Sequence, residues 1–302
     1  MYNLMQHKLW YFVFSAMIII PGTFSLITRG LSLSIDFTGG SLMEVSLQNS
    51  PTQTDLDEKI KAPFDKEKVT VTSVNRTGDN TFLIRSKPID NETHKRVLTL
   101  IEQQFGTTEE KRFESVGPTV GNELTRKAII SVIMATFAIV VYISYSFRKI
   151  PKPYSSWRFG MSAVIALLHD VLVVVGIFSI LGNWSVEIDA LFVTALLTII
   201  GFSVHDTIVV FDRIRENLSK MERASFESVV NESVIQTFVR SLNTSVTVLL
   251  ALLAILLFGG ETIRWFVLAL FIGIASGTYS SIFNAAPILV VWEQLANKHR
   301  ER

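Results

Sequence analysis

Six long apolar runs dominate the sequence. A helix needs about 20 mainly apolar residues to cross the roughly 30 Å hydrocarbon core of a bilayer. The composition fits such a protein, because 49% of the 302 residues are hydrophobic and only 18% are charged. We therefore predict an all-α membrane bundle of six transmembrane helices, at residues 9–28, 125–147, 159–181, 190–211, 241–258 and 265–291.

A cleaved signal peptide is the alternative for the first run. Its apolar stretch is longer than the usual signal-peptide core of about 7–15 residues, and no A-x-A-like cleavage site follows it. An uncleaved first helix is therefore favoured.

Lysine and arginine in the short loops predict the orientation, because the side of the membrane that is rich in them is normally cytoplasmic. The loops after the second and the fourth span are basic, whereas the two loops on the other side contain Arg264 as their only base. The basic loop residues are Arg148, Lys149, Lys152, Arg158, Arg213, Arg215, Lys220 and Arg223. Both termini are thus expected in the cytoplasm, which divides the chain into a first helix (1–28), an extracytoplasmic domain (29–124), a five-helix region (125–292) and a cytoplasmic tail (293–302).

The segment between the first two spans has the pattern of a small α+β domain. Alternating or β-branched runs at 42–48, 69–75, 81–87 and 111–116 predict strands, and a T-G-D-N turn joins the second strand to the third. Helices are predicted at 51–64 and 91–105. The order βαββαβ indicates a ferredoxin-like domain.

Asp206 is the only carboxylate in the apolar run 190–211. It lies six residues before Asp212, hence about 9 Å inside the membrane edge. An acid at this depth costs a few kcal/mol or more, so a water-filled cavity, a paired cation or a change of protonation must compensate. Asp206 is therefore a candidate functional residue, and a static buried pair between two helices is the alternative.

A partner for Asp206 is predicted on the fifth span. One helical face there begins polar, with residues at i, i+4, i+7, i+8 and i+11: Gln236, Arg240, Asn243, Thr244 and Thr247. Arg240 could form a charge pair with Asp206 between adjacent helices, or it could extend to the interface as a topology anchor.

Three further ionisable residues lie within spans. Asp170, preceded by His169, is near the middle of the third span, where an acid is most costly. His205 precedes Asp206 but points about 100° away around the helix. These residues are candidates for a relay, although for the histidines hydrogen bonding to a neighbouring helix is the favoured reading.

The sixth span carries a face of small residues that includes Gly273-x-x-x-Gly277. Such a face permits close helix contact, and packing within the chain is favoured over a homodimer. The absence of cysteine excludes disulfides and thiolate metal sites, and neither a catalytic constellation nor a basic aromatic patch is present. We expect no enzyme, no cofactor, no metal site and no nucleic-acid partner.

Five stretches carry a resemblance to a known family. They are IDFTGG (35–40), VGPTVGNEL (116–124), ALLHDVLVVVGIFS (166–179), IIGFSVHDTIVVFDRIREN (199–217) and LFGG (257–260). With these stretches the chain resembles SecF, the smaller membrane component of the bacterial SecDF translocation accessory complex, over nearly its whole length. SecDF has the resistance-nodulation-division type of transporter fold.

The resemblance implies a function in protein export. In such proteins the six helices pair with six of SecD, and proton flow through the bundle moves the outer domains, which helps a preprotein leave the SecYEG channel. The family's relay acid and arginine correspond to Asp206 and Arg240. The implied partners are SecD, SecYEG and the preprotein, with YajC and YidC as further candidates, in the bacterial cytoplasmic membrane.

Two residues depart from the family pattern, and two alternative functions are open. Trp265 stands where a smaller residue is expected after the outer turn. His205 stands where the family usually has asparagine, which leaves open whether H⁺ or Na⁺ is the coupling ion. The first alternative is a resistance-nodulation-division half-transporter that acts on a small molecule as a homodimer. The second is a purely structural assembly factor.

Overall fold

The structure, a computed structural model, describes residues 3–48, 56–78, 80–148, 150–151 and 153–300. Within these residues, six helical spans are long and apolar enough to cross a membrane, as predicted. They are Leu4–Arg29, Pro118–Ser146, Ser156–Trp184, Ala190–Lys220, Phe226–Phe258 and Glu261–Ala296. The chain forms two compact units, a helical unit of Met1–Ser32 and Ile130–Arg302 and a smaller unit of Leu33–Ile129.

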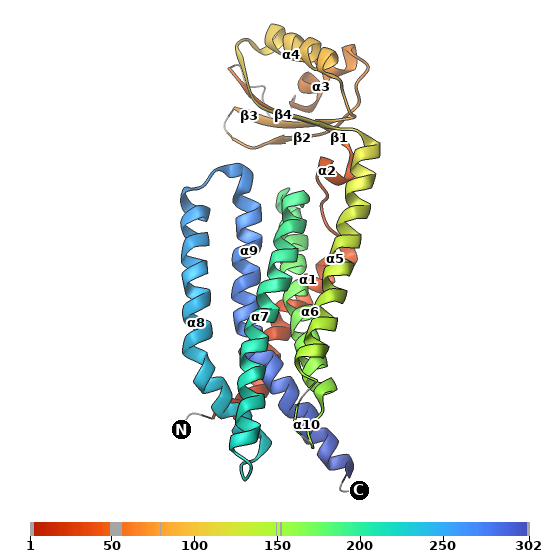
Figure 1. The fold of residues 1–302 in the computed structure, drawn as a ribbon. Helices are drawn as coiled ribbons and strands as arrows, with labels where there is room; N and C mark the ends of the chain where they lie inside the picture. The colour runs from red at the N-terminus through yellow and green to blue at the C-terminus, as the bar shows by residue number, and fades with distance from the viewer. Residues whose placement is uncertain (1–2, 49–55, 79, 149, 152, 301–302) are drawn as a thin grey trace. The chain divides into compact units, whose positions relative to one another are not determined.

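The helical unit contains α1 (Lys8–Arg29), most of α5 (Pro118–Ser146), α6 (Ser156–Leu181), α7 (Ala190–Lys220), α8 (Phe226–Phe258), α9 (Glu261–Ser280) and α10 (Ala286–Arg300). The start of α1 and the end of α10 lie at the same end of this unit (Figure 1). The same end carries the short connection from α7 to α8.

The helices extend beyond the apolar runs. α8 begins at Phe226, 15 residues before the predicted span, because Ser225 caps it by accepting a hydrogen bond from the Ser228 backbone N–H. Asp189 caps α7 in the same way, through the backbone N–H of Phe192 at 2.9 Å. Hydropathy detects only the part of a helix that lies in hydrocarbon, so these polar ends were not predicted.

The last span is interrupted by a π-helical turn, η3 (Ser281–Ala285), between α9 and α10. Pro287 follows this turn. A proline inside a helix has no N–H to donate, and its ring collides with the carbonyl four residues earlier. The wider π turn accommodates this defect, and such turns are frequent at functional sites.

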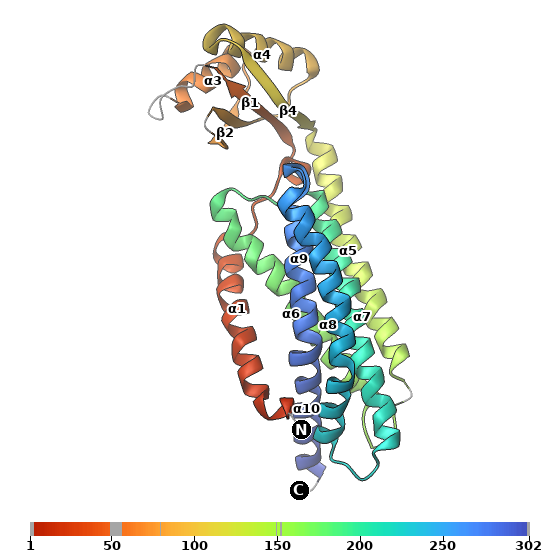
Figure 2. The same cartoon turned by 90° about the vertical axis from the view of Figure 1, so that its left-hand side faces the viewer.

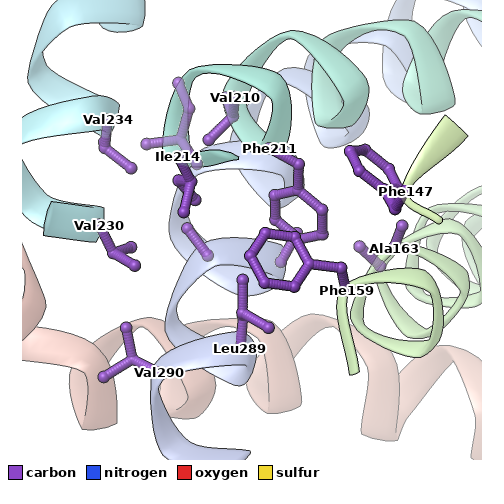
Figure 3. Close-up of a cluster of buried hydrophobic side chains, with 14 of the residues drawn as sticks. Phe147, Phe159, Ala163, Val210, Phe211, Ile214, Val230, Val234, Leu289 and Val290 are labelled. Carbon is purple, nitrogen blue, oxygen red and sulfur yellow. The ribbon is translucent and has the colours of Figure 1, made fainter. Parts of the chain in front are cut away.

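The apolar core of the helical unit is mainly aliphatic and contains the fully buried phenylalanine rings of Phe147, Phe159 and Phe211 (Figure 3). The Phe211 ring of α7 lies 5.7 Å from that of Phe147 and 5.4 Å from that of Phe159. Aliphatic residues of α8 and α10, such as Val230 and Leu289, complete the cluster. It ties the ends of five helices together.

The smaller unit contains the short helix α2 (Ile35–Thr38) and the elements β1 (Gly40–Leu47), α3 (Leu56–Lys66), β2 (Val71–Arg76), β3 (Thr81–Ser86), α4 (Asn91–Phe105) and β4 (Thr108–Val116). The strands form an antiparallel sheet in the order β2-β3-β1-β4. All four strands and α4 lie where the sequence predicts them. The predicted start of the other helix, at 51–55, lies outside the described residues, as do Lys149 and Lys152 of a basic loop.

Helices α3 and α4 cover one face of the sheet (Figure 2). Between them and the sheet lies a second apolar core with Val45, Phe82, Ile60 and Ile101. The turn before β1 requires glycine, because Gly39 and Gly40 have φ values of +71° and +132°, which other residues rarely adopt.

Candidate functional site

Asp206 lies on α7 in the interior of the helical unit and is only 2% exposed. Its Oδ2 accepts one hydrogen bond, from the Ser245 hydroxyl of α8 at 3.3 Å. The Ser245 oxygen in turn accepts a hydrogen bond of 2.6 Å from the Thr278 hydroxyl of α9. Asp206 therefore belongs to a chain of polar groups that crosses three helices.

The structure does not pair Asp206 with Arg240. Arg240 is exposed on α8, and no hydrogen bond or ion pair within the described residues joins the two charged groups. Arg240 precedes Ser245 by five residues, or about 7.5 Å along the helix axis. In this conformation a serine, not the arginine, occupies the position beside the carboxylate.

The two faces of α8 explain this arrangement. The face that packs inward carries a small hydroxyl residue every four positions: Ser233, Thr237, Ser241 and Ser245. The polar face predicted to meet Asp206 is exposed instead: Gln236, Arg240, Asn243, Thr244 and Thr247. The hydroxyl stripe is a signal that could have identified Ser245, since four-residue spacing of small residues is typical of close helix contacts.

Asp170 on α6 is fully buried and has four hydrogen-bond donors. Its Oδ2 accepts from Ser203 and Ser280, both at 2.6 Å, and its Oδ1 accepts from Ser276 at 2.7 Å and from His169 Nδ1 at 2.9 Å. The serines come from α7 and α9, so this carboxylate joins three helices.

The two histidines have different environments. His169 is 9% exposed, and its Nε2 has no hydrogen-bond partner within the described part of the chain. His205 is exposed, consistent with its position one residue before Asp206 on the helix. The structure thus brings His169, but not His205, into contact with a buried carboxylate.

Gly273 and Gly277 place α9 directly against α7. A Cβ atom on Gly273 would lie 2.3 Å from Ile199 Cδ1, and one on Gly277 would lie 3.1 Å from Ser203 Cβ. Both contacts join helices of the same chain and do not require a second copy. They bring the backbone of α9 close enough for Ser276 and Ser280 to reach Asp170.

The polar groups of the site are of kinds that can change their hydrogen-bonding role. A carboxyl group accepts hydrogen bonds when ionised and donates one when protonated, and serine and threonine hydroxyls can do both. Among the described residues, no three His, Cys, Asp or Glu side chains converge as a metal site would require. A change in the protonation of Asp206 would therefore alter its hydrogen bond with Ser245 of α8.

Two family models match the chain. The model described as protein export membrane protein SecD/SecF, C-terminal, matches residues 96–295, and the SecD/SecF GG motif matches residues 24–51. The protein translocase subunit SecF of Thermobaculum terrenum is 47% identical, over 97% of this chain and 94% of its own length. The SecF subunit of Anaerolinea thermophila is 44% identical with the same coverage.

Solved structures of longer chains share the fold. The crystal structure of SecDF from Thermus thermophilus, a translocon-associated membrane protein, has a TM-score of 0.81 and 30% identity and covers 97% of this chain. SecDF in its super-membrane-facing form has a TM-score of 0.70, at 30% identity and 99% coverage. This chain spans 39% and 40% of those two chains.

Proposed function

The chain belongs to the SecD/SecF family of protein export membrane proteins, as a multi-pass SecF-type translocase subunit, and from this premise we propose that it couples an ion gradient to late protein export through SecYEG. Its partner in this proposal is SecD. The relatives are named as translocase subunits, which does not favour the homodimeric small-molecule transporter.

The observation that carries the proposal is the weak tether of Asp206. An acid at this depth in a membrane is costly, yet Asp206 has one hydrogen bond, and its 3.3 Å length exceeds the usual range of about 2.5–3.0 Å between hydroxyl and carboxylate oxygens. Protonation adds an O–H donor to this carboxyl group and removes its charge. The Asp206–Ser245 contact between α7 and α8 then depends on whether a proton is bound.

Arg240 is the second member of the proposed relay. Its polar face on α8 is exposed in this chain, and exposed polar side chains within a membrane require water or a polar protein surface. A SecD half with its own intramembrane aspartate would supply that surface. Arg240 lies about 7.5 Å along and about 140° around the helix from Ser245, so exchanging Ser245 for Arg240 as the partner of Asp206 requires a large movement of α8 or extension of the long arginine side chain along the helix.

The remaining parts of the proposal concern the outer domain and its surroundings. The order β1-α3-β2-β3-α4-β4, with the sheet order β2-β3-β1-β4, supports a ferredoxin-like extracytoplasmic domain at 29–124. The basic loops support cytoplasmic termini and a tail at 293–302, and membership of the family supports a location in the bacterial inner membrane. YajC, YidC and the exported preprotein are further proposed partners, and no catalytic or cofactor role is proposed.

The test uses Asp206→Asn and Arg240→Ala in vesicles that contain SecD and SecYEG. Both variants should assemble normally but lose the stimulation of late export by an imposed proton gradient. Glu222→Gln is the control, because it neutralises an exposed acid just beyond α7. Normal gradient-stimulated export in Asp206→Asn would remove the coupling role and leave a structural assembly factor.

A further inference from the structure

The second buried carboxylate, Asp170, has a saturated set of hydrogen bonds. An ionised carboxylate has about four acceptor positions, and Asp170 uses four, with Ser203, Ser276, Ser280 and His169 as donors. The serine distances of 2.6–2.7 Å are those of strong hydrogen bonds to a charged acceptor. His169 is the titratable side chain in contact with it among the described residues, and the donors from α7 and α9 are hydroxyls.

These hydrogen bonds fix the rotation of α7. Ser203 lies three residues before Asp206 on the same helix, so the two side chains are about 60° apart around the helix axis. While the Ser203 hydroxyl is held by Asp170, α7 cannot rotate without breaking a strong bond. Gly277 adds a steric limit, because the position of its missing Cβ lies 3.1 Å from Ser203 Cβ and 3.6 Å from Asp170 Oδ2.

The contacts of α8 are different. Asp206 is joined to it by the single 3.3 Å bond to Ser245. Half of the residues in the most apolar part of α7 and of the last span are buried, compared with 17% for α8. At the level of Asp206 this long bond is the polar contact between α7 and α8, whereas nearer the start of α8 Asn217 donates to Ser233 at 2.9 Å and Arg213 donates to Gln236 at 2.6 Å.

We propose that Asp170 is a positioning residue: it locks α6, α7 and α9 into one body and thereby keeps Asp206 directed at Ser245 of α8. The inference rests on the proposed function of Asp206 as the proton-exchanging group. Asp170 itself stays in place and takes no part in proton transfer.

The experiment compares hydroxyl deletions in the SecD-containing complex in vesicles. Ser280→Ala removes one donor to Asp170, and Asp170→Asn replaces two acceptor oxygens by one. Ser281→Ala is the matched control, because Ser281 is equally buried in the next position but donates to the Thr278 backbone carbonyl. Gradient-stimulated export should fall by at least about threefold in the first two variants and stay unchanged in the control.

Two further measurements separate positioning from mere structural support. The infrared carbonyl band that disappears in Asp206→Asn should shift in Ser280→Ala and Asp170→Asn, since the surroundings of Asp206 change. In the double variant, adding Ser280→Ala to Asp170→Asn should cause no further loss of gradient-stimulated export, because both substitutions disrupt the same contact. If Asp170→Asn does not fold, Ser203→Ala replaces it, since it removes a single donor.

The outcomes distinguish this inference from the proposed function. An unshifted band, or losses that simply multiply in the double variant, would overturn the positioning role. A loss of export in Asp206→Asn, with Asp170→Asn behaving like Ser281→Ala, would overturn the positioning role alone. Unchanged export in Asp206→Asn would overturn the proposed function.

Discussion

The contact between Gly273 and Ile199 allows a quantitative test of the packing of α7 against α9. A Cβ atom on Gly273 would lie 2.3, 2.4 and 2.8 Å from the Cδ1, Cγ1 and Cγ2 atoms of Ile199. Ile199 is fully buried, and two of these atoms are attached directly to its Cβ. Rotating the outer end of the isoleucine side chain therefore cannot relieve the clash. Gly273→Ala should therefore force the two helices apart or strain the side chain.

The magnitude follows from two opposing contributions. Overpacking a close-packed interior costs about 1–3 kcal/mol. Replacing a helical glycine with alanine stabilises a helix by up to about 1 kcal/mol. Gly201→Ala on α7 isolates the second contribution, because nothing lies within 4 Å of the added Cβ. The difference in unfolding free energy between the two variants should then be about 1–3 kcal/mol, with Gly273→Ala the less stable.

Unfolding by heat or denaturant in detergent or nanodiscs measures this difference. Repeating Gly273→Ala in an Ile199→Ala background provides the internal check, because the smaller side chain leaves room for the new methyl group. In the Ile199→Ala background, Gly273→Ala should leave the protein at least as stable to unfolding as Gly201→Ala does. Equal stability of Gly273→Ala and Gly201→Ala in the native background would refute the close approach of the helices.

Three other outcomes are expected. Breaking the partly buried ion pair between Arg158 and Glu293 with Glu293→Gln should destabilise the helical unit by about 1–3 kcal/mol, and the apolar pair Arg158→Met with Glu293→Leu should recover most of this loss in denaturant unfolding. Gly22→Ala or Gly176→Ala should separate α1 from α6, because each new Cβ would lie within 2.9 Å of the other glycine's backbone, and an unfolding transition at lower temperature would show it. A backbone hydrogen bond lowers the pKa of Asp90, the N-cap of α4, so its stabilising effect is present above the ordinary carboxyl pKa and is lost as the pH falls through the lowered value; in thermal melts, Asp90→Ala should abolish this dependence.

The sequence predicts the number and order of the spans because the cost of placing polar groups in hydrocarbon acts on each segment separately. It predicts helix ends less well. The first 15 residues of α8 mix polar and apolar side chains, and the cap at Ser225 is a local hydrogen bond that hydropathy does not register. The π turn at Ser281–Ala285 depends on how Pro287 is accommodated, which composition alone does not reveal.

Asp170 and Asp206 can both be identified from the sequence, because an acid in an apolar run needs compensation. The difference between their hydrogen-bonding environments cannot be identified from the sequence. The three serines that surround Asp170 come from two helices that are more than 30 residues away in the chain, and each is unremarkable in its own segment. Only tertiary packing shows that one carboxylate is fully hydrogen-bonded and the other is held by a single long bond.

The orientation of α8 shows why polarity alone does not predict which face turns inward. Arg240 heads the more polar face, and an argument from charge pairing turns that face toward Asp206. The structure turns the serine and threonine stripe inward instead, because small side chains let α8 approach α7 and α9 closely. A long polar face that is left exposed in a membrane helix requires water or a second polar surface. The exposure of this face therefore supports the proposal that SecD supplies such a surface and completes the relay.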